Sequence, residues 1–322
     1  MSNPIPSRVV IATRGSDLAL WQSRWVQSRL EAVHPGITVE LRILKTTGDR
    51  FLDASLQAIG GKGAFTKEIT DAVLRGEADV AVHSLKDLPT QAEPGLRVWA
   101  YPQRFDSRDA WIGRDGLRYH DLKPGARVAT GSLRRAAQLK HRHPGVAAEP
   151  IRGNLNTRLR KFDEGTMDGM FLAVAGLERL GWGDRITERL EPEVFLPAPG
   201  QGALAVEGRD DAAARVLLAP LDDPDTRDAV AAERAFLAEL EAGGQIPVAA
   251  GAVLDGTTVT LDGLVAGLDG SQVLRGTERG LRVDGASVGR ALARRLVAQG
   301  ADRILAGVRN AEGLPGEPGS RT

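Results

Sequence analysis

Residues 78–90, with the sequence ADVAVHSLKDLPT, place a polar loop directly after a short apolar strand. The apolar run predicts a buried strand at residues 80–83, and Pro89 ends the loop that follows it. Lys86 and Asp87 then lie just past the carboxyl end of the strand, where open α/β sheets bind their ligands. Asp87 is therefore a candidate catalytic residue, with Lys86 beside it. The alternative is a turn-forming Asp87 next to a solvated Lys86.

Two other segments repeat this pattern of a strand, a polar loop and a helix. The strand at residues 9–12 continues into TRGS and a helix from Asp17, and the strand at residues 127–130 continues into the helix SLRRAAQLKHRH. Backbone N–H groups at a helix start, together with an arginine fork, form an anion site. For the TRGS loop at residues 13–16, a plain Ser16 helix cap with an exposed Arg14 is an equally open alternative.

Basic residues are concentrated in one part of the chain. Residues 127–160 contain eight Lys and Arg side chains but one acidic residue, Glu149. Almost no aromatic residue is interleaved with them for base stacking, and they gather at helix starts rather than along one face. A small ligand with several carboxylates or phosphates therefore fits this segment better than nucleic acid does.

The composition limits the class of protein. The 322 residues include 42 Lys and Arg and 42 Asp and Glu, so any anion site is local. The start of the chain lacks the pattern of a secretion signal, and no apolar run approaches the roughly 20 residues of a membrane span. We therefore expect a cytoplasmic protein that binds no membrane and is a monomer. The absence of cysteine excludes disulfides, thiolate zinc sites and a cysteine nucleophile, and we predict no metal site.

Residues 59–75, IGGKGAFTKEITDAVLR, predict a glycine-rich turn that leads into a helix. The turn is not a phosphate-binding P-loop, because Gly63 follows Lys62 where Ser or Thr is required. Two interpretations of Lys62 and Lys67 stay open: contact with an acidic ligand, or solvation.

The second half of the chain predicts a hinge and a further domain. Residues 195–206, FLPAPGQGALAV, form a Pro- and Gly-rich connector that returns to a strand, as between domains. Alternating strands at residues 253–254, 259–264 and 272–277, with a last helix at residues 286–299, predict a small α+β domain.

Nine motifs together resemble the porphobilinogen deaminase (hydroxymethylbilane synthase) family. In order between residues 9 and 248 they are TRGSDLA, KTTGDRFLD, IGGKGAFTKE, HSLKDLPT, TGSLRRAAQL, IRGNLNTRLRK, AGLERLG, LPAPGQGALAVE and ERAFLAELEAGGQIPV. The resemblance implies an α/β fold with two doubly wound, periplasmic-binding-protein-like domains and a small α+β C-terminal domain. The expected boundaries are residues 1–103 with 203–222 for domain 1, 107–199 for domain 2, 225–310 for the cofactor-loop domain 3, and 311–322 for a disordered tail.

The resemblance also implies a transferase reaction in tetrapyrrole (heme) biosynthesis. The family condenses four porphobilinogen units head to tail, releases ammonia at each step, and frees linear hydroxymethylbilane. Each pyrrole carries an acetate and a propionate, so the growing chain needs arginine forks and helix N-termini. Loss of ammonia leaves an electron-poor azafulvene, whose positive charge a fixed carboxylate stabilises while it relays protons.

The matched positions define the expected site. Asp87 corresponds to the catalytic carboxylate of the family, and Lys86 to a cation that acts beside it and binds the chain. The positions expected to bind the family's dipyrromethane cofactor and the growing chain are Arg14, Ser16, Lys62, Lys67, Lys86, Thr130, Ser132, Arg134, Arg135, Arg152, Asn154, Arg158 and Gln201.

One position departs from the family pattern. The family joins its dipyrromethane by a thioether to a Cys in a loop that is typically GGCQ followed by Pro, whereas residues 242–247 are AGGQIP here. Gly244 stands at the cofactor-attachment position and offers no atom for the bond, although glycine readily serves a turn. Noncovalent retention of the primer is one hypothesis.

Three interpretations follow from this departure. The sequence favours a deaminase, or a variant of one, that lacks covalent priming. The alternative is a catalytically impaired homologue that only binds linear pyrroles or another polyanion. An anion-binding solute receptor with the same fold would need a secretion signal or a partner domain, which the sequence does not indicate.

Overall fold

The computed structural model describes residues 5–46, 66–240 and 246–312. The chain divides into two compact units, which are described separately. The first unit comprises residues 1–105, 179–181 and 202–227, and the second comprises residues 106–178, 182–201 and 228–322.

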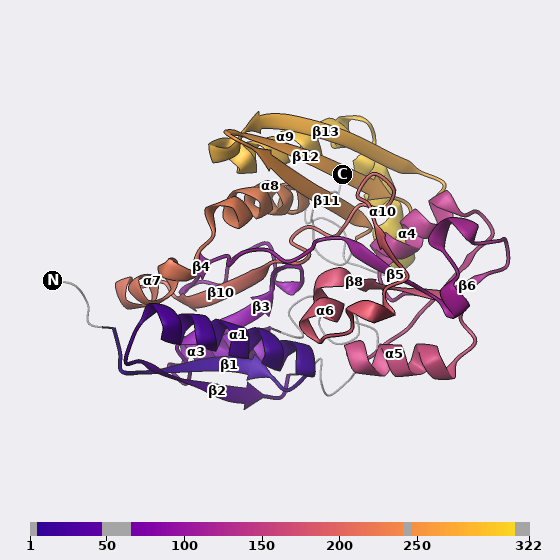
Figure 1. Ribbon diagram of the computed structural model, residues 1–322. Helices are drawn as coiled ribbons and strands as arrows, with labels where there is room; N and C mark the ends of the chain where they lie inside the picture. Colours follow the sequence, from indigo (N-terminus) through magenta and orange to yellow (C-terminus); the bar gives the residue numbers. More distant parts are fainter. Residues whose placement is uncertain (1–4, 47–65, 241–245, 313–322) are drawn as a thin grey trace. The chain divides into compact units, whose positions relative to one another are not determined.

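The first unit contains a five-stranded sheet in the order β2-β1-β3-β10-β4 (Figure 1). β1 is parallel to both of its neighbours, whereas β10 is antiparallel to β3 and β4. The strands are β1 (Arg8–Arg14), β2 (Thr38–Leu44), β3 (Val80–Ser84), β4 (Leu96–Ala100) and β10 (Leu204–Arg209). Since the chain leaves β1 toward β2 on one side and β3 lies on the other, the topological switch point falls between β1 and β3.

Helices cover both faces of this sheet. They are α1 (Asp17–Val33), α3 (Lys67–Leu74) and α7 (Ala212–Leu218). Val26 and Leu30 of α1 pack with α7 and the valines of β3, while Ile69 and Val73 of α3 pack against the opposite face. Strands buried on both faces explain why β1 and β3 are nearly continuous apolar runs.

The second unit repeats the plan in the order β7-β6-β8-β5-β9. β6 is parallel to β7 and β8, and β5 is antiparallel to β8 and β9. The elements are β5 (Asp109–Gly113), β6 (Arg127–Ala129), β7 (Ala147–Glu149), β8 (Gly169–Ala173), β9 (Glu188–Leu190), α4 (Leu133–Arg142), α5 (Leu155–Glu164) and α6 (Val174–Arg179). Trp111, Phe171 and Phe195 form its aromatic core, in which the last two rings stack at 4.7 Å.

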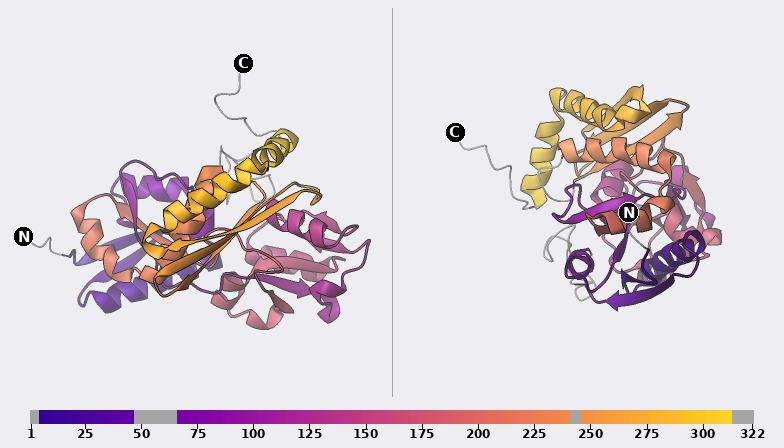
Figure 2. Two further views of the ribbon diagram at one scale, coloured as in Figure 1. Left: turned by 90° about the horizontal axis from the view of Figure 1, so that it is seen from above. Right: turned by 90° about the vertical axis from the view of Figure 1, so that its left-hand side faces the viewer.

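A three-stranded antiparallel sheet, β11-β12-β13, completes the second unit. Its elements are β11 (Val248–Asp255), β12 (Thr258–Ala266), β13 (Val273–Leu281), α8 (Pro224–Leu240), α9 (Gly285–Ala298) and α10 (Ala301–Glu312). Figure 2 shows α9 lying along this sheet, and Phe236 and Leu292 are fully buried between helices and strands. A Cβ atom on Gly289 would lie 2.2 Å from the carbonyl oxygen of Ala232, so α8 and α9 can approach only because this residue is glycine.

The sheets confirm the predicted α/β class with two doubly wound sheets and a small α+β domain. The prediction that residues 286–299 form the last helix is wrong, because α10 follows Gly300 and ends at Glu312. Gly300 has a φ of +105°, the left-handed conformation that commonly ends a helix, and the chain then turns into another amphipathic helix. The domain boundaries stay a prediction. Residues 311 and 312 of the expected disordered tail belong to α10, and residues 313–322 lie outside the described residues.

Among the helices that the structure describes, none has both the length and the apolar content that a membrane span requires.

Candidate functional site

The predicted catalytic loop follows β3 in the first unit. Because β3 is parallel to β1 and adjacent to it, the carboxyl ends of both strands meet at one edge of the sheet. A 3₁₀ turn, Leu85–Asp87, follows the strand; Leu85 is fully buried, and its N–H donates to the carbonyl oxygen of Ala203 at 3.0 Å. Asp87 is exposed on this turn. Buried Leu85 therefore fixes the turn, while Asp87 on the same turn is exposed to solvent.

Buried hydroxyl and amide groups connect the two loops at this edge. Gln22 Nε2 donates to Ser84 Oγ at 2.8 Å, and Ser23 Oγ donates to Thr13 Oγ1 at 2.7 Å. Since Gln22 and Ser23 are neighbours on α1, this helix fixes both Thr13, which precedes Arg14, and Ser84 at the end of β3. The sequence argument did not identify these supporting residues, because a polar residue on a helix gives no sign of its partner.

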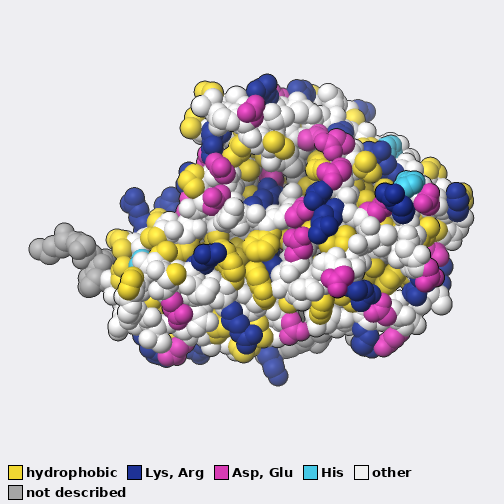
Figure 3. Space-filling model, in the orientation of Figure 1, with side chains coloured by type: hydrophobic (Ala, Val, Ile, Leu, Met, Phe, Trp, Pro, Cys, Tyr) yellow, Lys and Arg dark blue, Asp and Glu magenta, His cyan; other side chains and the backbone are white. Residues whose placement is uncertain are grey.

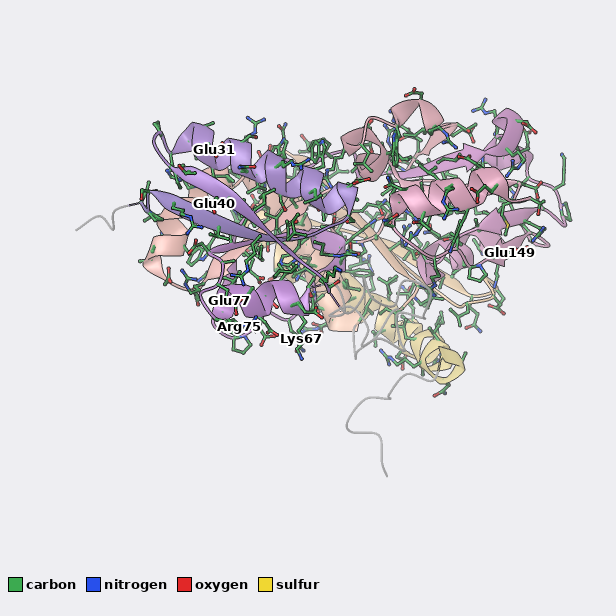
Figure 4. All side chains as sticks on the ribbon, turned by 90° about the horizontal axis from the view of Figure 1, so that it is seen from below. Glu31, Glu40, Lys67, Arg75, Glu77 and Glu149 are labelled. Carbon is green, nitrogen blue, oxygen red and sulfur yellow. The ribbon has the colours of Figure 1, made fainter. Side chains whose placement is uncertain are left out.

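The loop after β1 begins α1 as predicted. Ser16 is the N-cap, and its Oγ accepts from the Ala19 N–H at 3.4 Å. Arg14 is half-buried beside it. Lys67 is exposed at the start of α3 (Figure 4). The roles of these three residues in ligand binding stay predictions.

In the second unit, Thr130 and Ser132 follow the central parallel strand, β6. Thr130 Oγ1 accepts from the Ser132 N–H at 3.2 Å, and Ser132 caps α4 by accepting from the Arg135 N–H at 3.4 Å. These hydroxyls therefore organise a helix start at the switch point between β6 and β8, which is the equivalent of the β1–β3 edge in the first unit.

The loop after β7, which carries Arg152 and Asn154 and leads to Arg158 of α5, lies next to the loop after β6. Asn154 caps α5 through its Oδ1, which accepts from the Thr157 N–H at 2.9 Å. Arg158 Nε donates to the carbonyl oxygen of Gly153 at 2.7 Å. The Arg152 guanidinium lies 3.7 Å from the point that a Cβ atom of Gly131 would occupy. The loops after β6 and β7 therefore bring hydroxyls, an amide and guanidinium groups to one sheet edge.

Arg134 and Arg135 share a buried partner within the second unit, and their binding of a ligand stays a prediction. Both are buried against Asp109, which is fully inaccessible to solvent. Arg134 Nη1 lies 2.7 Å from Asp109 Oδ2, and Arg135 Nη2 lies 2.6 Å from Oδ1. Burial acts to raise the pKa of Asp109, but the two guanidinium groups outweigh it and hold that pKa well below its usual range.

Comparison with known proteins decides the family. A model described as the porphobilinogen deaminase, dipyromethane cofactor binding domain matches residues 9–216, and the porphobilinogen deaminase C-terminal domain matches residues 228–298. The chain belongs to the porphobilinogen deaminase family.

Relatives of this family match nearly the whole chain. Porphobilinogen deaminase from Syntrophobacter fumaroxidans is 48% identical over 92% of this chain and 96% of its own length. The protein of that name from Syntrophotalea carbinolica is 49% identical over 93% of this chain and 96% of its own. Among solved structures, a YaeC-family lipoprotein from Enterococcus faecalis has a TM-score of 0.43 at 16% identity, over 67% of this chain and 91% of that one.

Arg179 is a candidate for this porphobilinogen deaminase site that the sequence argument did not single out, although its motif AGLERLG contributed to the resemblance. It is 6% exposed and is the last residue of α6; it belongs to the first unit, whereas the rest of that helix belongs to the second. Its Cζ lies 4.6 Å from the ring centre of Phe105, and its Nη2 donates to the carbonyl oxygen of Gly202 at 2.8 Å. Burial lowers the pKa of Arg179 to about 10. Its Nε has no hydrogen-bond partner within the described part of the chain.

Two predicted positions, Lys62 and Gly244, lie outside the described residues. On the face drawn in Figure 3, acidic and basic side chains are interspersed, as the equal numbers of both kinds in the sequence lead one to expect.

Proposed function

We propose that this chain is a hydroxymethylbilane synthase, a transferase that condenses porphobilinogen units and releases ammonia at each step. The observation that carries the proposal is the exposed carboxylate of Asp87 at the switch point of the first sheet. It stands on a turn anchored by buried Leu85, and the family match extends over both sides of it. Such a carboxylate is held in place while it remains open to a substrate.

The residues at the two switch points have separable roles. Asp87 stabilises the positive charge that develops on the pyrrole N–H as ammonia leaves, and it relays protons. Lys86 neutralises substrate carboxylates next to it. The helix starts at Ser132 and Asn154, with Arg152, bind acetate and propionate groups through N–H donors and a guanidinium fork.

The family's dipyrromethane fits this chain only in part. Hydroxyl, amide and guanidinium donors gather at the edge formed by the loops after β6 and β7, and they suit the four carboxylates of a dipyrromethane. A thioether needs a sulfur atom, which the sequence does not supply at Gly244 or at any other position. We therefore propose no step through a covalently attached group, and we propose that any primer is held by ionic contacts alone.

The test measures porphobilinogen consumption by the purified parent and by its Gly244→Cys variant, with the product oxidised to uroporphyrin and read by absorbance. Gly243→Cys is the matched control, because it supplies a thiol one residue away. We expect turnover by Gly244→Cys and not by Gly243→Cys. Turnover by the parent as well shows that the covalent anchor is dispensable. Inactivity of all three proteins contradicts the proposal and favours a homologue that only binds linear pyrroles.

The remaining parts of the proposal concern the setting of the enzyme. Its partners are the small molecules porphobilinogen and hydroxymethylbilane, and we propose that it acts as a cytoplasmic monomer. Equilibrium sedimentation of the purified chain tests the oligomeric state, and a mass near 34.3 kDa is expected.

A further inference from the structure

Three residues predicted to bind the pyrrole chain share one partner inside the second unit. Arg134, Arg135 and Gln201 all donate to Asp109, the first residue of β5. The four come from three separate segments: the helix α4, the strand β5, and the Pro- and Gly-rich connector of residues 195–206. A single buried carboxylate therefore joins elements that the sequence keeps far apart.

The hydrogen bonds fix the orientation of both guanidinium groups. Arg134 donates through Nη1 to Asp109 Oδ2 at 2.7 Å and through Nη2 to Oδ1 at 3.1 Å. Arg135 donates through Nε to Oδ1 at 2.8 Å. Backbone carbonyls complete the set, because Leu196 accepts from Arg134 at 2.8 Å and Phe171 accepts from Arg135 at 3.1 Å.

Gln201 extends this arrangement into the connector. Its Nε2 lies 3.2 Å from Asp109 Oδ1 and 2.8 Å from the carbonyl oxygen of Ser107. Gln201 is fully buried. The connector is therefore held by the same carboxylate that orients the two arginines.

The charges in this cluster do not balance. Asp109 supplies one negative charge against two guanidinium groups, and no other carboxylate in the described residues forms an ion pair with Arg134 or Arg135. A buried cation without a counter-charge is costly, so the cluster is stabilised when an anion approaches it. The arrangement thus suits a carboxylate-bearing ligand, provided that the guanidinium groups keep their orientation.

We propose that Asp109 is a positioning residue for anion binding: it holds Arg134 and Arg135 in the geometry that receives pyrrole carboxylates, and its bond with Gln201 fixes the connector beside them. This inference rests on the proposed function. Asp109 does not itself contact the ligand, because its side chain is fully enclosed by these partners and the strand. It acts through the arginines.

Charge and position make opposite predictions for Asp109→Asn. The substitution removes a negative charge near an anion site, so an effect of charge alone strengthens the binding of a polycarboxylate. If Asp109 positions the arginines, its loss releases them from a fixed geometry, and binding weakens although the positive charge has increased. The direction of the change therefore separates the two roles.

The experiment uses the full chain and freshly prepared hydroxymethylbilane as the probe. Pyrrole retained after rapid desalting is quantified by its colour reaction with dimethylaminobenzaldehyde, over a series of probe concentrations. Circular dichroism establishes that each variant is folded at the assay temperature. We expect Asp109→Asn to weaken retention by about tenfold or more. Equal or tighter retention by a folded Asp109→Asn protein overturns the inference.

Two further variants complete the test. Asp163→Asn removes an exposed carboxylate of the same unit, which pairs with Arg185 at 2.6 Å, and is expected to leave retention unchanged. If Asp109→Asn does not fold, Gln201→Leu decides, because it removes one bond to Asp109 without changing the charge. We expect weaker retention, and unchanged retention by this variant overturns the inference.

A failure of the proposed function gives a different result. If the parent chain retains no pyrrole at any concentration, the proposed function fails, and this inference fails with it. If the parent retains pyrrole and the folded variants retain as much, only the role of Asp109 is refuted.

Discussion

Asp87→Asn tests the assignment of the exposed carboxylate after β3. The substitution keeps the shape of the side chain and removes its charge, and the turn stays anchored by buried Leu85. At a separation of about 4 Å, one charge stabilises another by about 1 kcal/mol in water and by about 4 kcal/mol at the effective dielectric constant near a protein surface. With about 1.4 kcal/mol per factor of ten, kcat is expected to fall by about 5-fold to about 1,000-fold.

The assay follows porphobilinogen consumption and ammonia release at saturating substrate, in whichever background turns over, the parent or Gly244→Cys. Asp210→Asn is the control, because Asp210 is an exposed carboxylate of the same unit that lies 3.7 Å from Arg97. The control is expected to keep the parental kcat. A kcat for Asp87→Asn equal to that of the control would refute the role of Asp87 in stabilising the developing charge.

Three further predictions concern the scaffold. Glu233 is fully buried and accepts two backbone N–H groups, at 2.7 and 2.9 Å, so Glu233→Gln should lower the free energy of unfolding by about 1–3 kcal/mol; an unchanged urea midpoint would contradict this. A Cβ atom on Gly169 would lie 2.0 Å from the Trp111 ring, so Gly169→Ala should cost about 1–3 kcal/mol or more, and a thermal melt that matches the parent would exclude such a clash. Burial raises the pKa of Tyr119; the stability from its neutral hydroxyl is therefore present below the unfolded pKa and is lost as pH rises toward the folded one. Tyr101→Phe leaves Tyr119 as the one tyrosine of the sequence. In this variant tyrosinate absorbance should appear only with alkaline unfolding, and a titration that precedes unfolding would be inconsistent with a buried Tyr119 hydroxyl.

Local sequence patterns predicted most of the elements that carry the site. The strands predicted at residues 9–12 and 80–83 lie within β1 and β3, and α1 begins at Asp17 after its Ser16 cap. These elements are specified by burial on both faces of a sheet or by a cap within one turn, and both are local properties. The short strand β9 and the helix α6 were not predicted, because elements of so few residues carry little periodicity.

The environment of the predicted arginines could not be read from the same patterns. The sequence places Arg134 and Arg135 at a helix start, which suggested contact with a ligand. The structure shows that both pair with Asp109, 25 and 26 residues earlier in the chain. An ion pair across that separation depends on the order of strands in the sheet, and residue spacing does not reveal it.

The sequence was sufficient for the family and the α/β class that it implies, through nine motifs in series, and for the order of the polar loops, because each loop follows its own strand and caps its own helix. It also determined that no thioether can form, since that requires only the absence of cysteine. The tertiary structure decided which polar groups are shared: Gln22 of α1 with Ser84 of β3, and Asp109 of β5 with the arginines of α4. The physical reason is that buried polar groups must find partners wherever the sheets bring them together, and the sheet order is set by packing over the whole unit.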